Sequence, residues 1–76
     1  MKKIENSVCL KEFGDLIKAE RIRRRMSQAE VAQIAEISQP YYSKIELAQR
    51  GIDLVGALKI CKALNLDLSD FIKRYI

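Results

Sequence analysis

Hydrophobic residues recur along the chain at the period of an α-helix, and short polar segments interrupt the pattern. From about residue 8 to residue 25 they share one helix face, formed by Val8, Phe13, Leu16 and Ile17. Four shorter helical stretches follow. They run from Gln28 to before Ile37, from about residue 39 to residue 47, from Leu54 to Leu64 and from Leu68 to about Tyr75. The pattern predicts an all-α fold of five helices.

Two helix-start signals lie close together in the middle of the chain. Ser27 and Glu30 have the spacing of a capping box, in which each side chain accepts from the other residue's backbone N–H. Ser38 is a second N-cap, and Pro40 stands in the first turn, where its missing N–H has no intrahelical partner. Ile37 closes the turn between them as an apolar plug. Two short helices joined by a tight turn are predicted here.

The two short helices offer different surfaces. The first has a compact apolar face, which we expect to consist of Ala29, Val31, Ala32 and Ile34. The second has little to bury beyond Tyr42 and Ile45. Its remaining side chains, expected to face outward, are Gln39, Pro40, Tyr41, Ser43 and Lys44. Amide, hydroxyl and ammonium groups on so short a helix favour a binding role over a purely structural one.

The last two helices are expected to complete the core. Asp53 caps the fourth helix, whose apolar stripe is predicted to be Leu54, Ala57, Leu58, Cys61 and Leu64. Asp67 and Asp70 are spaced like a capping box for the last helix, and Asn65 is expected in a left-handed conformation between the two helices. The last helix carries Phe71, Tyr75 and Ile76, which either contact a second copy of the chain or cover the domain's own core.

The length of 76 residues fits one domain, with residues 1–7 expected to form a polar N-terminal tail and residues 8–76 the folded part. Apolar residues make up 49% of the chain and charged residues 32%, which is typical of a folded globular domain. Fourteen Lys and Arg against ten Asp and Glu give a net charge of +4. This balance favours an anionic partner.

The sequence contains few residues or motifs that could support catalysis or bind a metal. The chain has no His, no glycine-rich phosphate loop, and two cysteines, Cys9 and Cys61, that are far apart. We therefore expect no enzyme, no metal and no cofactor, and we interpret both cysteines as small buried residues. Without a signal peptide or a long apolar run, the expected location is the cytoplasm, with no membrane contact.

Three segments together carry a family resemblance: Ser27-Gln28-Ala29-Glu30-Val31-Ala32, Ile37-Ser38 and Tyr42-Ser43-Lys44-Ile45-Glu46. With these segments, the chain from about Phe13 to Ile72 resembles the phage-repressor or Xre-like helix-turn-helix family of DNA-binding regulators, small restriction-modification controllers included. The resemblance implies a compact five-helix lambda-repressor-like domain. The second and third helices would form the helix-turn-helix, and the third would lie in the major groove of double-stranded DNA.

The resemblance also assigns roles to individual residues. The expected base contacts are Gln39, Pro40 and Lys44, with Ser43 and Tyr41 nearby. The expected phosphate contacts are Gln28, Tyr42, Gln49 and Arg50, with the alternative that Tyr42 belongs to the core. Arg21 and Glu46 are expected to form a structural ion pair.

Several positions depart from the family pattern, among them Glu20, where the family usually has an apolar residue. Glu36 stands in the turn where the family favours glycine, and a residue with a side chain would be strained at positive φ there. The residues after Glu46 are expected to extend the third helix and leave Gly51 as its terminating residue. Gly14, inside the first helix, would permit close packing of another helix.

A domain this small covers only a few base pairs, so the resemblance implies a homodimer on a palindromic operator. No small-molecule effector is expected, since no further ligand domain is visible. The alternative is a protein-interaction module or an antitoxin that uses the same helical scaffold to bind a partner protein. That reading calls for an apolar or acidic outer side on the third helix, whereas the side present here is polar and cationic.

Overall fold

The computed structural model describes residues 3–4 and 6–75, and within them the five predicted helices are present. They are α1 (Ser7–Arg23), α2 (Gln28–Ala35), α3 (Gln39–Glu46), α4 (Leu54–Ala63) and α5 (Ser69–Tyr75). Two two-residue strands, β1 (Lys3–Ile4) and β2 (Ile52–Asp53), pair antiparallel, with Lys3 opposite Asp53 and Ile4 opposite Ile52. The segment expected to be a polar tail therefore includes a strand, and its last residue, Ser7, begins α1.

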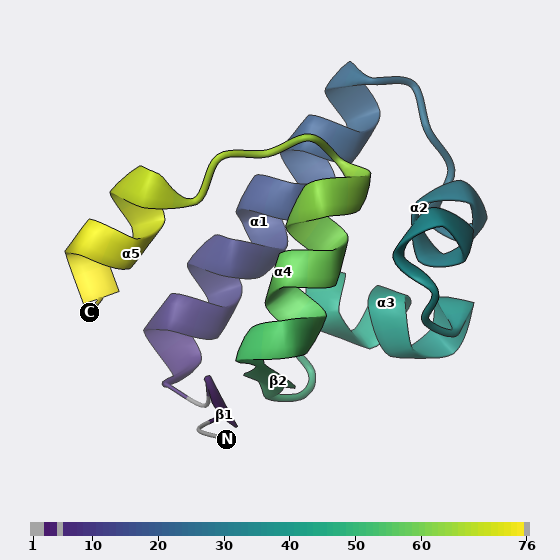
Figure 1. Cartoon of the computed structure of the whole chain (residues 1–76). Helices are drawn as coiled ribbons and strands as arrows, with labels where there is room; N and C mark the ends of the chain where they lie inside the picture. Colours follow the sequence, from purple (N-terminus) through teal and green to yellow (C-terminus); the bar gives the residue numbers. More distant parts are fainter. Residues whose placement is uncertain (1–2, 5, 76) are drawn as a thin grey trace.

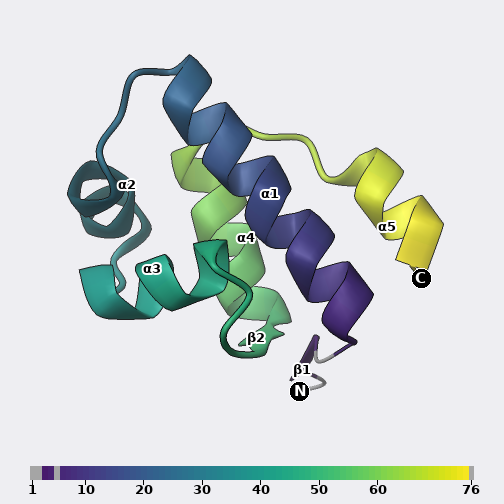
Figure 2. The same cartoon turned by 180° about the vertical axis from the view of Figure 1, so that it is seen from behind.

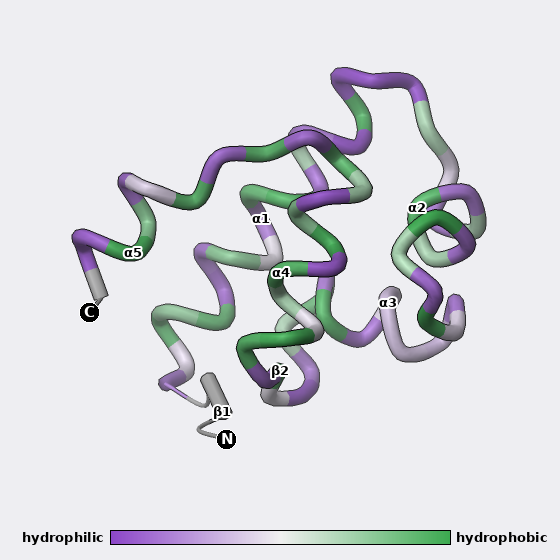
Figure 3. The backbone as a smooth tube through the Cα atoms, in the orientation of Figure 1, coloured by the Kyte–Doolittle hydropathy of each residue, from purple (hydrophilic) through white to green (hydrophobic). Residues whose placement is uncertain are grey.

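The helices form two groups around a central pair. α1 and α4 lie side by side, α2 and α3 cover one side of this pair, and α5 lies on the opposite side after an extended connection (Figures 1 and 2). α2 and α3 thus lie together, on the side of the central pair opposite α5 (Figures 1 and 2). Figure 3 shows hydrophobic segments recurring along α1 and α4, whereas most of α3 is hydrophilic.

Polar side chains fix the helix starts. The Ser27–Glu30 capping box is formed in both directions, Ser38 Oγ accepts from the Tyr41 amide, and Asp53 accepts from the Gly56 amide. The predicted capping box between Asp67 and Asp70 is wrong. Asp67 instead accepts from the amide and the hydroxyl of Ser69, so this short local turn starts α5.

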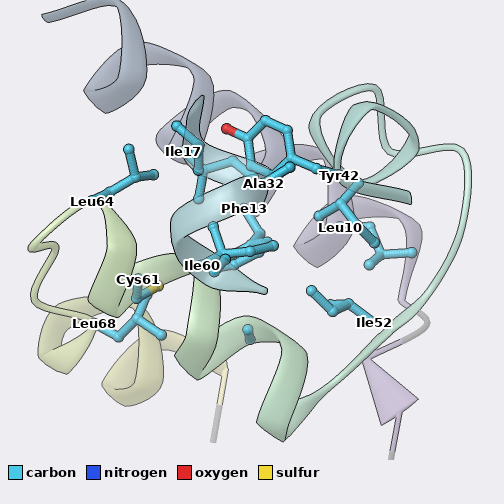
Figure 4. Packing of buried hydrophobic residues seen from close by; sticks show 14 residues of the cluster. Leu10, Phe13, Ile17, Ala32, Tyr42, Ile52, Ile60, Cys61, Leu64 and Leu68 are labelled. Carbon is cyan, nitrogen blue, oxygen red and sulfur yellow. The ribbon is translucent and has the colours of Figure 1, made fainter. Parts of the chain in front are cut away.

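The core lies where α1, α2, α3 and α4 meet. Figure 4 shows side chains from all four helices converging on Phe13 and Ile60. The fully buried large side chains are Tyr42, Phe13, Ile17, Ile45, Ile52, Ile60, Leu64 and Val31. Close packing of this set connects the helix-turn-helix to the central helix pair.

The predicted inner faces of three helices were partly wrong. On α4, Leu54 and Leu58 are 44% and 49% exposed, and Ile60 is fully buried in their place. Gly56 explains the rotation of this helix, because an added Cβ there would lie 3.1 Å from the Tyr41 hydroxyl and from an Ile52 side-chain carbon. On α2, Ala29 is exposed and Ile34 is 57% exposed, because Val31, Ala32 and Ala35 form the inner face. On α1, Val8 is exposed and the inner face begins at Cys9 and Leu10.

Phe71 covers the domain's own core. Its ring centroid lies 5.6 Å from that of Phe13, at an interplanar angle of 60°, and the residue is partly buried against the core cluster. This corresponds to the second of the two roles expected for it. Ile76 and the side chain of Tyr75, the other two dimer candidates, lie outside the described residues.

Candidate nucleic-acid interface

The outer side of α3 carries the polar side chains that the sequence indicated. Tyr42, Ile45 and Glu46 are buried, so the opposite side of the helix faces away from the protein. Gln39, Pro40 and Lys44 are exposed, and Ser43 is half-buried. No hydrogen bond or ion pair within the described ranges engages the side chains of Gln39 or Lys44. Their donors are available to a partner.

An ion pair fixes α3 against α1, as expected from the sequence. Arg21 Nε donates to Glu46 Oε2 at 2.7 Å, and Arg21 Nη2 donates to Glu46 Oε1 at 3.1 Å. Arg21 Nη1 also donates to the Met26 carbonyl at 3.0 Å, in the connection between α1 and α2. Only 5% of Glu46 is exposed. A bidentate contact in so buried a place fixes both the position and the rotation of α3.

The charge state of Glu46 follows from its surroundings. Burial alone would raise the pKa of this carboxyl, but the Arg21 guanidinium and the Gln28 amide, which both donate hydrogen bonds to it, lower its pKa below the ordinary value of 4.5. Glu46 is thus ionised at neutral pH, and the positive charge of Arg21 balances its negative charge. The pair is a permanent feature of the folded domain under ordinary conditions.

Gln28 was expected to contact a phosphate. In the structure, its side chain also binds a group within the protein. Its Nε2 donates to Glu46 Oε1 at 3.2 Å, which joins the first residue of α2 to the ion pair. The amide NH2 group has two hydrogens, so one donor remains. The first backbone N–H groups of α2 also lack intrahelical partners and favour an anion.

Gly14 allows α1 to lie directly on the end of α3. An added Cβ at this position would stand 2.5 Å from the Glu46 carbonyl oxygen and 2.9 Å from that of Ile45. These are backbone atoms, so no side chain can move aside to make room. α1 and α3 can therefore pack this closely only because residue 14 has no side chain.

Tyr42 cannot contact a phosphate from its position in this structure. The residue is fully buried, so the expected phosphate contact is wrong and the core alternative is right. Burial raises the pKa of the Tyr42 hydroxyl strongly, and the neighbouring Glu46 carboxylate raises it further. The hydroxyl therefore stays neutral, and Figure 4 shows the Tyr42 ring among the side chains of the core.

Left-handed residues end two helices of the motif. Glu36, at φ 59°, is the C-cap of α2, so a residue with a side chain takes the left-handed conformation at the position where the family favours glycine. The predicted role of Gly51 is wrong, because α3 ends at Glu46 and Ala48 takes the left-handed conformation at φ 57°. The Gln49 amide donates to the Lys44 carbonyl at 2.8 Å, so the left-handed residue that terminates the helix lies three positions earlier than expected. Asn65 has φ 51°, as predicted.

Gln49 and Arg50 lie exposed on the loop after α3, as phosphate contacts require, whereas Tyr41 is half-buried. The Tyr41 ring faces the Arg50 guanidinium and packs against the core. Sequence reasoning missed one residue, Leu47, which is 58% exposed. It follows Lys44 by three positions and Pro40 by seven, a spacing that continues their outward stripe and could have been recognised.

Other kinds of site find no support. The described residues contain no group of three or more potential metal ligands, and no helix among them is long and apolar enough to cross a membrane. Both cysteines are buried and unpaired, and burial raises the pKa of the Cys61 thiol to about 12. Such a thiol is not reactive at neutral pH.

Fold and site together define a DNA-binding helix-turn-helix transcription regulator of the Xre and Cro/lambda type, which is not an enzyme. The helix-turn-helix family matches residues 17–71, and the chain belongs to this family. No curated protein sequence matches the chain significantly.

Solved structures agree with this assignment. The restriction-modification controller protein C.AhdI from Aeromonas hydrophila is 26% identical, with a TM-score of 0.78 over 84% of this chain and 97% of that one. The controller protein C.Esp1396I, solved as a tetramer with its natural 35 base-pair operator, is 25% identical, with a TM-score of 0.80 over 91% of both chains. The clp gene regulator ClgR from C. glutamicum, at 18% identity, shares the fold, with a TM-score of 0.77 over 86% and 84%.

Proposed function

We propose that this protein is a sequence-specific regulator of transcription that reads the major groove of double-stranded DNA with α3. The observation that carries the proposal is the way in which α3 is held against the rest of the domain. Its inner side is fixed by the Arg21–Glu46 pair, while the side chains of Gln39 and Lys44 face outward without partners among the described residues. A major groove about 12 Å wide admits a helix presented in this way. Because such a protein works where the chromosome is, the proposal includes a cytoplasmic location.

Individual side chains then have distinct roles in reading a sequence. Gln39 suits adenine, because its amide can accept from N6 and donate to N7. Lys44 suits the O6 and N7 acceptors of guanine. Pro40 offers only apolar contact, for example with a thymine methyl, and Leu47 extends this apolar contact along the groove. Ser43 can donate or accept at the edge of the same surface.

Phosphate contacts would hold the domain in register on the duplex. The α2 N-terminus supports this role with free backbone N–H groups and the remaining hydrogen of the Gln28 amide. Gln49 and Arg50 are exposed on the loop at the other end of α3. These groups carry no sequence information, so their loss should weaken binding to all duplexes alike.

A homodimer on a palindromic operator belongs to the same proposal. C.Esp1396I binds its operator as a tetramer, which supports assembly of related chains on DNA. Phe71 is partly buried in its own domain and leaves limited surface for a second copy. Leu54, Val55 and Leu58 are each more than 40% exposed on one side of α4, and we propose this surface as the dimer contact.

Fluorescence anisotropy tests the function directly. The protein is titrated onto a random duplex and onto a duplex chosen by selection, each at two salt concentrations. We expect tight binding to the selected duplex, and weaker binding to random DNA with a steep dependence on salt. If neither duplex binds at low salt, the DNA-binding proposal is wrong, and a protein-binding module or antitoxin on the same scaffold becomes the explanation.

A further inference from the structure

Arg50 lies on an exposed loop, yet two contacts hold its guanidinium. The Arg50 Cζ lies 4.4 Å from the centroid of the Tyr41 ring, over its face. Arg50 Nε donates to the Gly51 carbonyl at 3.2 Å. A stack on an aromatic face and one hydrogen bond together restrict both the position and the plane of the group.

Tyr41 is itself firmly placed. It is half-buried at the edge of the core, and its hydroxyl lies where a Cβ at Gly56 would be 3.1 Å away. Only the absence of a side chain at Gly56 leaves room for the hydroxyl at the start of α4. The tyrosine is therefore fixed on its α4 side and presents a ring face to Arg50 on the other.

The pair stands on one particular flank of α3. Tyr41 shares its side of the helix with Ile45, four positions later, whereas Glu46 lies on the other flank, where it binds the α2 residue Gln28. The outward stripe of Pro40 and Lys44 runs between the two flanks. The α2 N-terminus and Arg50 thus border opposite sides of the surface proposed to enter the groove.

A major groove is bordered by two sugar-phosphate backbones, one on each side. The α2 N-terminus provides anion-binding groups toward one of them. Arg50 Nη1 and Nη2 make no hydrogen bond within the described part of the chain, so both can donate to the other. Guanidinium binds phosphate oxygens through two parallel hydrogen bonds, a geometry that benefits from a fixed plane.

We propose that Tyr41 is a positioning residue, whose ring holds the Arg50 guanidinium for a DNA phosphate on the side of the groove opposite the α2 N-terminus. Tyr41 then acts through Arg50 and does not read a base, in contrast to the sequence-based expectation. This inference rests on the proposed function.

A double-mutant cycle tests the inference by fluorescence anisotropy on selected and random duplexes over a series of salt concentrations. Arg50→Ala should weaken binding to both duplexes by a similar factor, and should reduce the slope of log K against log salt by about one unit. Tyr41→Leu should weaken binding about two- to fivefold in the unsubstituted background, as expected for a lost cation–π contact. It should have no further effect when Arg50 is already alanine.

Three further variants separate the proposed role from simpler ones. Tyr41→Phe keeps the ring and should bind within a factor of about two. Arg50→Lys keeps the charge but not the planar group, so it should bind more weakly with a nearly unchanged salt slope. Lys62→Ala removes a charge from the far end of α4 and should leave binding unchanged. If Tyr41→Leu proves too unstable to assay, Tyr41→Met fills the space without an aromatic face.

Two results would overturn the inference while the proposed function stands. The first is specific binding by the unsubstituted chain with an unchanged salt slope in Arg50→Ala. The second is a Tyr41→Leu result that does not depend on Arg50: either an equal effect in the unsubstituted chain and in Arg50→Ala, or a changed base preference in Tyr41→Leu. If the unsubstituted chain binds no DNA, both the function and this inference are wrong.

Discussion

Glu46 ties α3 to two neighbouring helices, since it accepts from Arg21 of α1 and from Gln28 of α2. It is almost fully buried, and Arg21 is its counter-ion through two hydrogen bonds. A buried pair of this kind is not by itself a large source of stability, because desolvation offsets much of the attraction. Removing one partner is different, since it leaves the other charge buried and unpaired.

We predict that Glu46→Gln lowers the free energy of unfolding by about 3 kcal/mol, because Arg21 loses its counter-ion in a buried place. Urea denaturation followed by circular dichroism measures this change. Asp15→Asn is the matched control, since the Lys11–Asp15 pair is exposed on α1 and should leave the midpoint unchanged. A Glu46→Gln midpoint equal to that of the unsubstituted chain would show that the pair is unimportant.

The same carboxylate makes stability depend on pH. Its pKa is lowered by folding, so the unfolded chain takes up this proton first as the pH falls. The contribution is fully present above the ordinary pKa of 4.5 and is lost as pH falls through the lower pKa of the folded state. As the pH falls through 4.5 and below, the unsubstituted chain should therefore lose more stability than Glu46→Gln. Parallel curves for the two proteins would contradict this assignment.

At the scale of elements, the contact between α1 and α3 depends on a missing side chain. Gly14 brings the α1 backbone against the last carbonyls of α3, and this closeness lets Arg21 reach Glu46 from the same helix. Helix propensity alone disfavours glycine in the middle of α1. The packing requirement therefore outweighs the propensity of the single helix.

We predict that Gly14→Ala destabilises the fold by about 1–3 kcal/mol, because the new methyl group forces α1 away from α3. Propensity predicts the opposite sign, a gain of about 1 kcal/mol. Thermal unfolding decides between the two. Ala19→Gly, at an exposed position of α1, calibrates propensity in the same helix and should cost about 1 kcal/mol. Stabilisation by Gly14→Ala would refute the packing argument.

The elements were predictable from sequence because their signals are local. The starts of α2, α3 and α4 are each marked by a capping side chain that accepts from a backbone N–H within three residues, namely Ser27 with Glu30, Ser38 and Asp53. Pro40, in the first turn of α3, has no N–H to satisfy. The face that each helix buries was less predictable, because it depends on partners distant in sequence. α4 turns Ile60 inward and Leu58 outward since Gly56 meets Ile52 and Tyr41, contacts that no helical period reveals.

The candidate site divides in the same way. Arg21 and Glu46 were paired through the family resemblance, 25 residues apart, and no local pattern would have joined them. The outward positions of Gln39 and Lys44 followed from helical spacing. Helical spacing placed Tyr42 inward and Tyr41 outward, but only tertiary packing shows that the Tyr41 ring is half-buried and lies beside Arg50.

At the scale of the whole molecule, the exposed apolar side of α4 is a surface without a function in the single domain. We predict that Leu58→Lys shifts the protein toward the monomer, because a charge at the centre of this surface opposes burial against a second copy. Sedimentation equilibrium measures the shift. Ile34→Lys is the control, since Ile34 is similarly exposed but belongs to α2. An unchanged dimer in Leu58→Lys, or loss of the dimer in both variants, would exclude this surface.

The packing of α3 determines which of its side chains can face DNA bases. α1 and α2 pack against α3 on its inner side. If its two flanks make the proposed phosphate contacts, the outward stripe of α3 is left to select the bases. Lys44 is the only cation on this stripe, and it should prefer guanine at one position of each half-site.

The most direct test is selection of binding sites from a random duplex library by the unsubstituted protein, by Lys44→Ala and by Lys62→Ala. We predict the same site for the first and last proteins. Lys44→Ala should lose preference at one base pair per half-site, by about 1–3 kcal/mol, and keep the others. If all three proteins select the same sequence with equal preference at every position, α3 does not read DNA through Lys44, and the central claim is contradicted.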